Sequence, residues 1–121
     1  MTLNKTFLIG RLVRDPDVRI TPTGIHIARF TLAIDRYRKK ETGESVTDFI
    51  RIVCWRRLAE ICGQYLKKGK LIAIEGRLQV DLFEKEGQQR ESYEVVADTM
   101  QMLDKTAESE SQEAILEVQN F

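Results

Sequence analysis

Aromatic and basic side chains alternate along residues 48–55, and this is the first pattern in the chain that could perform chemistry. Phe49, Arg51 and Trp55 are spaced two or four residues apart, so in a β-strand they would share one face. Aromatic rings offer flat surfaces on which unpaired bases stack, and arginine binds phosphate. The pattern therefore predicts a surface that binds single-stranded nucleic acid with little sequence preference.

Two other segments carry residues of the same types. A strand expected at 71–83 places Arg77 and Phe83 on its outward side, and a polar loop expected at 35–45 holds a basic run around Tyr37. The predicted stacking residues are Trp55, Phe49, Phe83 and Tyr37, and the predicted phosphate-binding residues are Arg36, Arg38, Lys39, Arg51, Arg56 and Arg77. Two alternatives stay open: a neighbouring subunit could cover the aromatic rings, and the charged loop could be merely solvated.

The sequence lacks the residue sets that metal sites and common catalytic sites require. Its only cysteines, Cys54 and Cys62, are eight residues apart, and His26 is its single histidine. A zinc site needs three or four nitrogen or sulfur ligands, so we expect two buried free thiols, no metal and no cofactor. The close acidic pairs at 15/17 and 84/86 fall in expected turns, and no glycine-rich phosphate loop is present. We therefore expect a binding protein and not an enzyme.

Period-two alternation of apolar residues predicts the strands that would position these side chains. The expected strands are 6–13, 18–20, 25–34, 48–55, 71–83 and 92–97, with a hairpin turn at 84–90. Gly76 is expected to let its strand bend sharply. The residues assigned to the core include Phe7, Phe30, Ile72, Ile74, Leu78, Val80 and Leu82.

One segment has helical spacing instead. Its apolar positions are Leu58, Ile61, Cys62, Tyr65 and Leu66, which form a single stripe on a short helix. Gly69 is expected to cap that helix. Strands interrupted by one helix predict an all-β domain at residues 1–103, an OB-fold, which is a five-stranded Greek-key barrel with one short helix between strands three and four.

Charge is distributed unevenly along the chain. Residues 1–103 hold 18 Lys and Arg against 14 Asp and Glu, a net charge of +4, whereas residues 104–121 hold one Lys against five acids, a net charge of −4. A basic body with an acidic, mobile tail at 104–121 is what a polyanion-binding protein would show. No apolar run approaches the roughly 20 residues that span a bilayer, and no secretory signal is visible, so we expect a cytoplasmic protein that does not associate with membranes.

Six motifs in order resemble the bacterial single-stranded DNA-binding protein family over residues 3–103. They occupy residues 3–5 with 8–12, 15–19, 30–33, 58–60 with 65–69, 74–78, and 94–97 with 100–103. The resemblance implies an OB fold, a homotetramer around which single-stranded DNA wraps, association with the nucleoid, and roles in DNA replication, recombination and repair. It also implies stacking by Phe49, Trp55 and Phe83, with Tyr37 the nearest match to a fourth aromatic.

The C-terminal end departs from the family pattern. Members typically end in a very acidic tip that closes with Pro-Phe and docks on partner proteins, whereas this sequence ends Glu117-Val118-Gln119-Asn120-Phe121. The resemblance makes Glu117 and Phe121 the candidate contacts for replication and repair proteins. Three rival hypotheses remain: a primosome-type or RNA-binding OB-fold protein, a barrel nuclease, and a scaffold whose aromatic face is a subunit interface.

Overall fold

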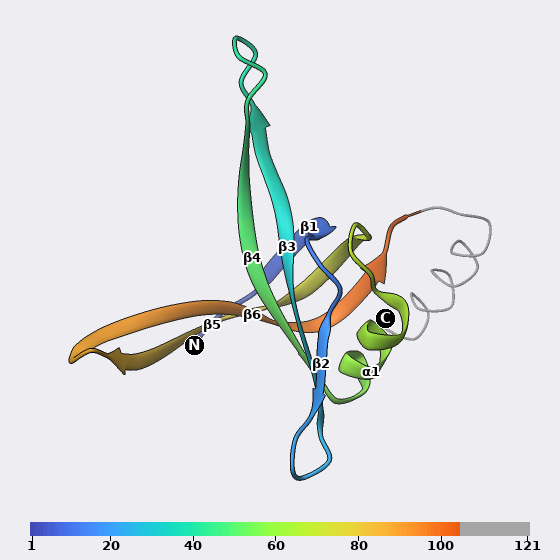
Figure 1. Cartoon of the computed structure of the whole chain (residues 1–121), viewed down its shortest axis with the longest axis vertical. Coiled ribbons are helices and arrows are strands. Elements are labelled where there is room, and N and C mark those ends of the chain that lie inside the picture. The colour runs from blue at the N-terminus through green and yellow to red at the C-terminus, as the bar shows by residue number, and fades with distance from the viewer. Residues whose placement is uncertain (105–121) are drawn as a thin grey trace.

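Residues 1–104 are described by the computed structural model of the protein, and they form strands and one helix around a single apolar core (Figure 1). The elements are β1 (Thr6–Leu12), β2 (Asp17–Ile20), β3 (His26–Arg38), β4 (Ser45–Trp55), α1 (Arg56–Tyr65), β5 (Leu71–Lys85) and β6 (Gln88–Met102). Strand pairing runs β1–β5–β6–β4–β3 and returns to β1, while β2 pairs with β3 beside β1, on the edge opposite β4. Among the strands of residues 1–104, only β4 and β6 pair in parallel. The predicted OB-fold is confirmed, with β2 as an additional edge strand.

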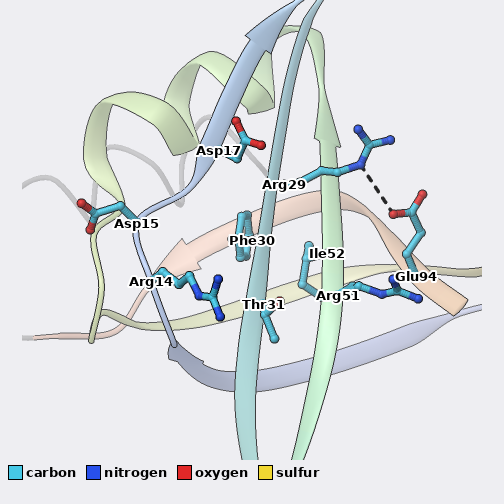
Figure 2. Close-up of a pocket in the computed structure, with 9 residues that line it drawn as sticks. All are labelled: Arg14, Asp15, Asp17, Arg29, Phe30, Thr31, Arg51, Ile52 and Glu94. Atoms are coloured by element: carbon cyan, nitrogen blue, oxygen red, sulfur yellow. Dashed lines mark ion pairs between the residues drawn. The ribbon is translucent and has the colours of Figure 1, made fainter.

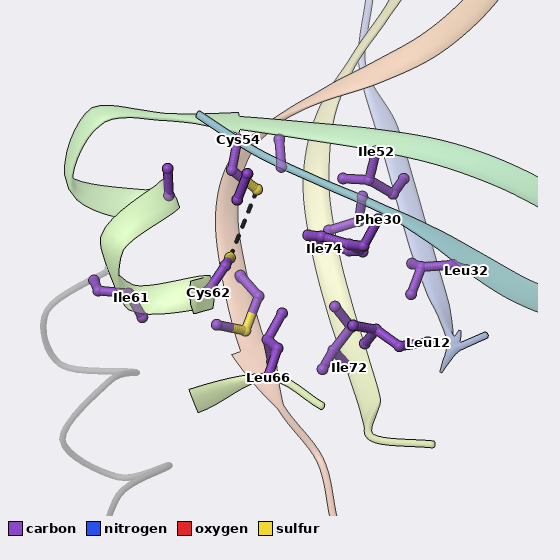
Figure 3. Close-up of a cluster of buried hydrophobic side chains, with 14 of the residues drawn as sticks. Leu12, Phe30, Leu32, Ile52, Cys54, Ile61, Cys62, Leu66, Ile72 and Ile74 are labelled. Carbon is purple, nitrogen blue, oxygen red and sulfur yellow. Dashed lines mark hydrogen bonds between the residues drawn. The ribbon is translucent and has the colours of Figure 1, made fainter. Parts of the chain in front are cut away.

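The core is built from alternate residues of the five barrel strands and from one face of α1 (Figure 3). Its fully buried side chains include Leu32, Ile52 and Ile72. Cys54 and Cys62 are buried free thiols, as predicted, and the Sγ of Cys62 lies 3.6 Å from that of Cys54. This hydrogen bond and burial raise the pKa of the Cys62 thiol above its ordinary value.

Two long hairpins extend from the barrel as arms that point in different directions (Figure 1). The β3–β4 arm keeps its pairing out to Arg38 and Ser45, so its loop is shorter than the predicted 35–45. The β5–β6 arm ends in the two-residue turn Glu86-Gly87, whose φ values of 55° and 75° are those of a type I′ turn. Because that turn matches the strand twist, pairing continues to its edge, so the hairpin turn predicted at 84–90 is confirmed around Gly87 but is tighter than predicted.

The arms overturn part of the predicted core. Leu78, Val80 and Leu82 have the inward parity of β5, yet they are 44%, 46% and 60% exposed. Beyond Gly76 the hairpin leaves the barrel, so neither of its faces has a covering layer. The predicted bend is confirmed at Gly76: the β5–β6 register shifts there, and a Cβ would lie 2.2 Å from the Val96 carbonyl oxygen.

Two other predictions about local structure are wrong. Phe7 is 71% exposed, because the inward positions of β1 are those of Leu8 and Leu12. Gly69 does not cap α1, since the helix ends at Tyr65 in a turn closed by the Leu66 N–H and the Cys62 carbonyl. Gly69 lies in the following turn, where its N–H donates to the Leu12 carbonyl.

Candidate nucleic-acid interface

A row of four paired residues crosses the outward side of the sheet. Arg29 on β3 lies opposite Val53 on β4, Val53 lies beside Val96 on β6, and Val96 lies opposite Arg77 on β5. Directly paired residues place their side chains on the same face. Both valines are buried, while the arginines at the two ends are exposed. We call this surface the arginine-rimmed face: an apolar floor with an arginine at each end, of which Arg29 faces Glu94 and Arg77 faces Asp98.

Trp55 adjoins this floor, two residues beyond Val53 on the same side of β4. It is 41% exposed and lines a hollow together with Arg56 and Arg77. Strand β4 passes into α1 without a loop, because Trp55 is extended and Arg56 takes the left-handed φ of 58°. The predicted residues Trp55, Arg56 and Arg77 are thus brought together from three elements.

A second hollow lies where the two arms diverge. The β4–β6 pairing covers only residues 52–53 and 95–96, so the strands separate beyond it. Phe49, which is 66% exposed, lines this hollow together with Arg51 and Tyr93. Arg51 donates a hydrogen bond of 3.3 Å to the Tyr93 carbonyl oxygen. Phe49 and Arg51 are therefore also brought together, as their spacing predicts.

Tyr93 is an aromatic residue of this hollow that the sequence reasoning missed. Its position on β6 has the inward parity of the buried Val95, which assigns it to the core by pattern alone. It is exposed because the β5–β6 arm has already left the barrel at this point. The signal available in the sequence was the turn at Glu86-Gly87, which permits strand pairing to run that far.

The other predicted site residues lie along the arms. Phe83 is exposed on β5, opposite Arg90 and close to the turn of its arm. Tyr37 is exposed near the outer end of β3, opposite Val46. Arg38 and Lys39 follow it at the tip of the β3–β4 arm. The structure therefore spreads these candidates outward from the arginine-rimmed face and does not gather them into one hollow.

Two of the predicted phosphate-binding arginines are held in ion pairs. Arg36 makes a two-pronged pair with Asp48, with both N–O distances 2.9 Å, and this keeps the pKa of the Asp48 carboxyl below its usual value. Arg77 pairs with Asp98 at 3.3 Å. The candidates without an acidic partner among residues 1–104 are Arg38, Lys39, Arg51 and Arg56. These four are the more available to phosphate, because binding need not break an existing pair.

The predicted tail contacts Glu117 and Phe121 lie outside the described residues. Asp104, at the start of the segment expected to be a tail, accepts a hydrogen bond of 2.9 Å from the Leu71 N–H and pairs with Arg11 at 3.3 Å. Residues 1–104 contain no cluster of three or more His, Cys, Asp or Glu side chains placed to hold a metal ion. Within the same residues, no helix is long and apolar enough to cross a membrane.

Comparisons with known proteins agree with this geometry. The model of the single-strand binding protein family matches residues 3–103. A single-stranded DNA-binding protein of Staphylococcus aureus (strain MRSA252) is 42% identical over 118 residues, which cover 97% of this chain and 76% of that protein. One from Oceanobacillus iheyensis is 44% identical over 103 residues, covering 84% of this chain and 64% of its own length.

A solved structure extends the likeness to three dimensions. The Plasmodium falciparum SSB in complex with ssDNA superposes with a TM-score of 0.75 at 30% identity, over 86% of this chain and 97% of that one. The family match covers nearly all of the residues that build the barrel, both arms and the hollows between them. The chain belongs to the single-strand binding protein family.

Proposed function

We propose that this chain binds single-stranded DNA across its arginine-rimmed face, without strong preference for sequence. The observation that carries the proposal is Trp55, exposed beside a buried valine floor that has an arginine at each end. An apolar strip with an arginine at each end suits a chain of bases whose phosphates lie on its outer side, where they can take the place of the carboxylates of Glu94 and Asp98 that these arginines now face. The relatives' names and the family match support the same ligand.

In this proposal the bases and the phosphates bind to different residues. Bases stack on Trp55 and on Phe49, and such stacking is worth about 1–3 kcal/mol per base. Phosphates bind first to Arg51 and Arg56, whose side chains have no acidic partner within the described chain. Arg36 and Arg77 can bind phosphate only when it displaces the carboxylate of Asp48 or Asp98 from their ion pairs. The arm residues extend the surface at Phe83, Tyr37, Arg38 and Lys39.

The chain acts, on this proposal, as a binding protein and not as an enzyme. It covers and protects single strands exposed during DNA replication, recombination and repair, and it is found with DNA in the nucleoid. Glu117 and Phe121 remain the proposed contacts for replication and repair proteins, as the C-terminal part of a separate acidic segment that follows the barrel.

We also propose that the chain assembles as a homotetramer. Phe7 and Ile9 are exposed on β1, and the β5–β6 arm exposes Leu78, Val80 and Leu82 on one of its faces. Strand β1 pairs with β3 only at Arg11 and Leu12, so one edge of its first half has no partner strand within residues 1–104. An unpaired edge next to exposed apolar side chains is a surface that another copy can cover.

Competition between nucleic acids tests the ligand. A fluorescently labelled dT oligomer is bound to the full chain and followed by anisotropy, while unlabelled single-stranded DNA, RNA of the same sequence and duplex DNA of the same length compete. The proposal predicts that single-stranded DNA displaces the label at the lowest concentration. Equal competition by duplex would contradict it, and stronger competition by RNA would favour the RNA-binding alternative. Cleavage of the labelled oligomer in the presence of Mg²⁺ or Ca²⁺ would indicate a nuclease.

A further inference from the structure

A third hollow lies on the same side of the sheet, across Arg51 from the hollow between the arms. Its volume is about 350 Å³, and its walls come from the segment before β2, from the first residue of β2, and from β3, β4 and β6. Arg51 and Glu94 line this hollow as well as the one that holds Phe49, so the two hollows are neighbours that share a wall. Figure 2 shows Arg14 and Arg51 lying on either side of Thr31, with Asp15 on the side of Arg14 and Glu94 on the side of Arg51.

Most charged side chains of this hollow already make ion pairs or hydrogen bonds within the protein, but Arg14 does not. Glu94 faces Arg29 at 3.8 Å, and Asp17 pairs with Arg19 at 3.3 Å. Asp15 accepts a hydrogen bond of 2.8 Å from the Lys68 N–H. Arg14 is exposed and has no ion pair or side-chain hydrogen bond within residues 1–104. Its guanidinium is therefore a positive charge without an ion-pair partner among these residues, and it lies beside the surface proposed to bind DNA.

Thr31 supplies a hydroxyl between the two arginines. It lies directly opposite Arg51 in the β3–β4 register, so both side chains are on the outward face. Its carbonyl oxygen accepts a hydrogen bond of 3.1 Å from the Val13 N–H, which ties the segment carrying Arg14 to β3. The backbone directly before Arg14 is thus held against β3 at Thr31.

We propose that Arg14, Thr31 and Arg51 form a phosphate-binding site that carries the single strand beyond Phe49, across β3, toward the segment before β2. The two guanidiniums and the hydroxyl can each donate hydrogen bonds to phosphate oxygens. The carboxylates of Asp15 and Asp17 discourage the strand from continuing past them. This inference rests on the proposed function, and it assigns to Arg14 and Thr31 a role that the aromatic pattern of the sequence did not suggest.

The substitution Arg14→Gln tests the site, with Arg19→Gln as its matched control. Arg19 is equally close in sequence, exposed and basic, but is paired with Asp17 on β2. Each counterion released by a phosphate contact on a single strand contributes a slope of about −0.7 in log K against log salt, which is about fivefold in affinity at 0.1 M. We expect R14Q to weaken dT-oligomer binding about fivefold and to make the slope shallower by about 0.7, while R19Q leaves the slope unchanged.

A second variant, Thr31→Val, keeps the shape of the side chain and removes only its hydroxyl. We expect T31V to bind less tightly with an unchanged salt slope, because it loses a hydrogen bond and no charge. If R14Q, R19Q and wild type bind dT oligomers with equal affinity and equal salt dependence, the proposed phosphate-binding site is wrong. The proposed function would still stand in that case, because the wild-type chain binds. Failure of the wild-type chain itself to bind dT oligomers would refute both. Thermal unfolding of each variant confirms that the comparison is made on folded protein.

Discussion

Trp55 and Arg56 are adjacent in sequence at the junction of β4 and α1, but their side chains serve different parts of the proposed ligand. Trp55 lies two residues beyond the buried Val53 on the same side of β4, and so its ring offers a base an apolar surface. Arg56 has a left-handed backbone, which lets the chain turn from strand to helix in a single residue. Substitution of Trp55 can therefore remove a stacking surface, and substitution of Arg56 can remove a positive charge, each without changing the other.

Truncation of the stacking aromatics is expected to weaken binding without unfolding the protein. Trp55→Ala and Phe49→Ala should each cost about 1–3 kcal/mol of single-strand affinity, measured by anisotropy, because each loses one stacking surface. Ile20→Ala is the control, since Ile20 is also exposed but lies on β2. Variants that unfold, or that dissociate while each folded molecule binds normally, would show that these rings are structural.

Arg56→Gly separates the charge of Arg56 from its conformation. Glycine relieves about 1 kcal/mol of left-handed backbone strain but adds a similar entropy to the unfolded chain, so the free energy of unfolding should stay within about 1 kcal/mol of wild type. Single-strand affinity should fall about fivefold at 0.1 M salt. Arg57→Gln is the matched control, because Arg57 pairs with Glu60 at 3.2 Å. Equal affinities for the two variants would argue against a phosphate contact at Arg56.

At the scale of elements, the sequence predicted which side chains share a face better than which faces are covered. Alternation placed Phe49, Arg51 and Trp55 on one side of β4, and the structure agrees. The same alternation placed Leu82 in the core, where the β5–β6 arm in fact has no covering layer. It also put Val53 on the outward side, where neighbouring side chains bury it. A period of two fixes orientation, whereas burial depends on how far each hairpin extends past the barrel.

Pairing and electrostatics were also beyond what the sequence pattern could resolve. Asp48 lies twelve residues from Arg36, and only the β3–β4 register brings the two together. In the sequence, Arg14 is simply one charged residue next to an acidic pair. The structure shows, through the Val13–Thr31 hydrogen bond, that the segment carrying Arg14 lies beside β3. Contacts of this kind join residues that no local spacing relates, so they emerge only once strand register is known.

The packing of α1 on β4 leads to a pH-dependent prediction. Below the ordinary thiol pKa of 9.0, Cys62 is protonated in both the folded and the unfolded chain. Above that pH the unfolded chain loses the proton while the raised pKa keeps the folded thiol neutral, so this group lowers the free energy of unfolding by up to about 1.4 kcal/mol per pH unit. The stability difference between wild type and Cys62→Ala should therefore narrow above pH 9 in urea unfolding. A difference that stays constant from pH 7.5 to 10 would contradict this.

At the scale of the whole molecule, the binding surface of one copy is limited, and assembly would multiply it. Light scattering at micromolar concentration should show a tetramer. Phe7→Asp should lower the assembled fraction, because it places a charge on the exposed apolar side of β1, which lies beside an unpaired strand edge. Ile20→Asp introduces the same charge on β2 and should leave the mass unchanged. A wild-type monomer at this concentration would rule out the proposed assembly.

The central claim, that unpaired bases stack on the arginine-rimmed face, is tested most directly by the fluorescence of Trp55, the only tryptophan in the chain. Titration of the full chain with poly(dT) should quench its emission to saturation, and added salt should reverse the quenching with a log–log slope of about −0.7 per phosphate contact. Duplex DNA at the same nucleotide concentration should leave the emission nearly unchanged. Emission that does not respond to poly(dT), or that responds equally to duplex, would contradict the account.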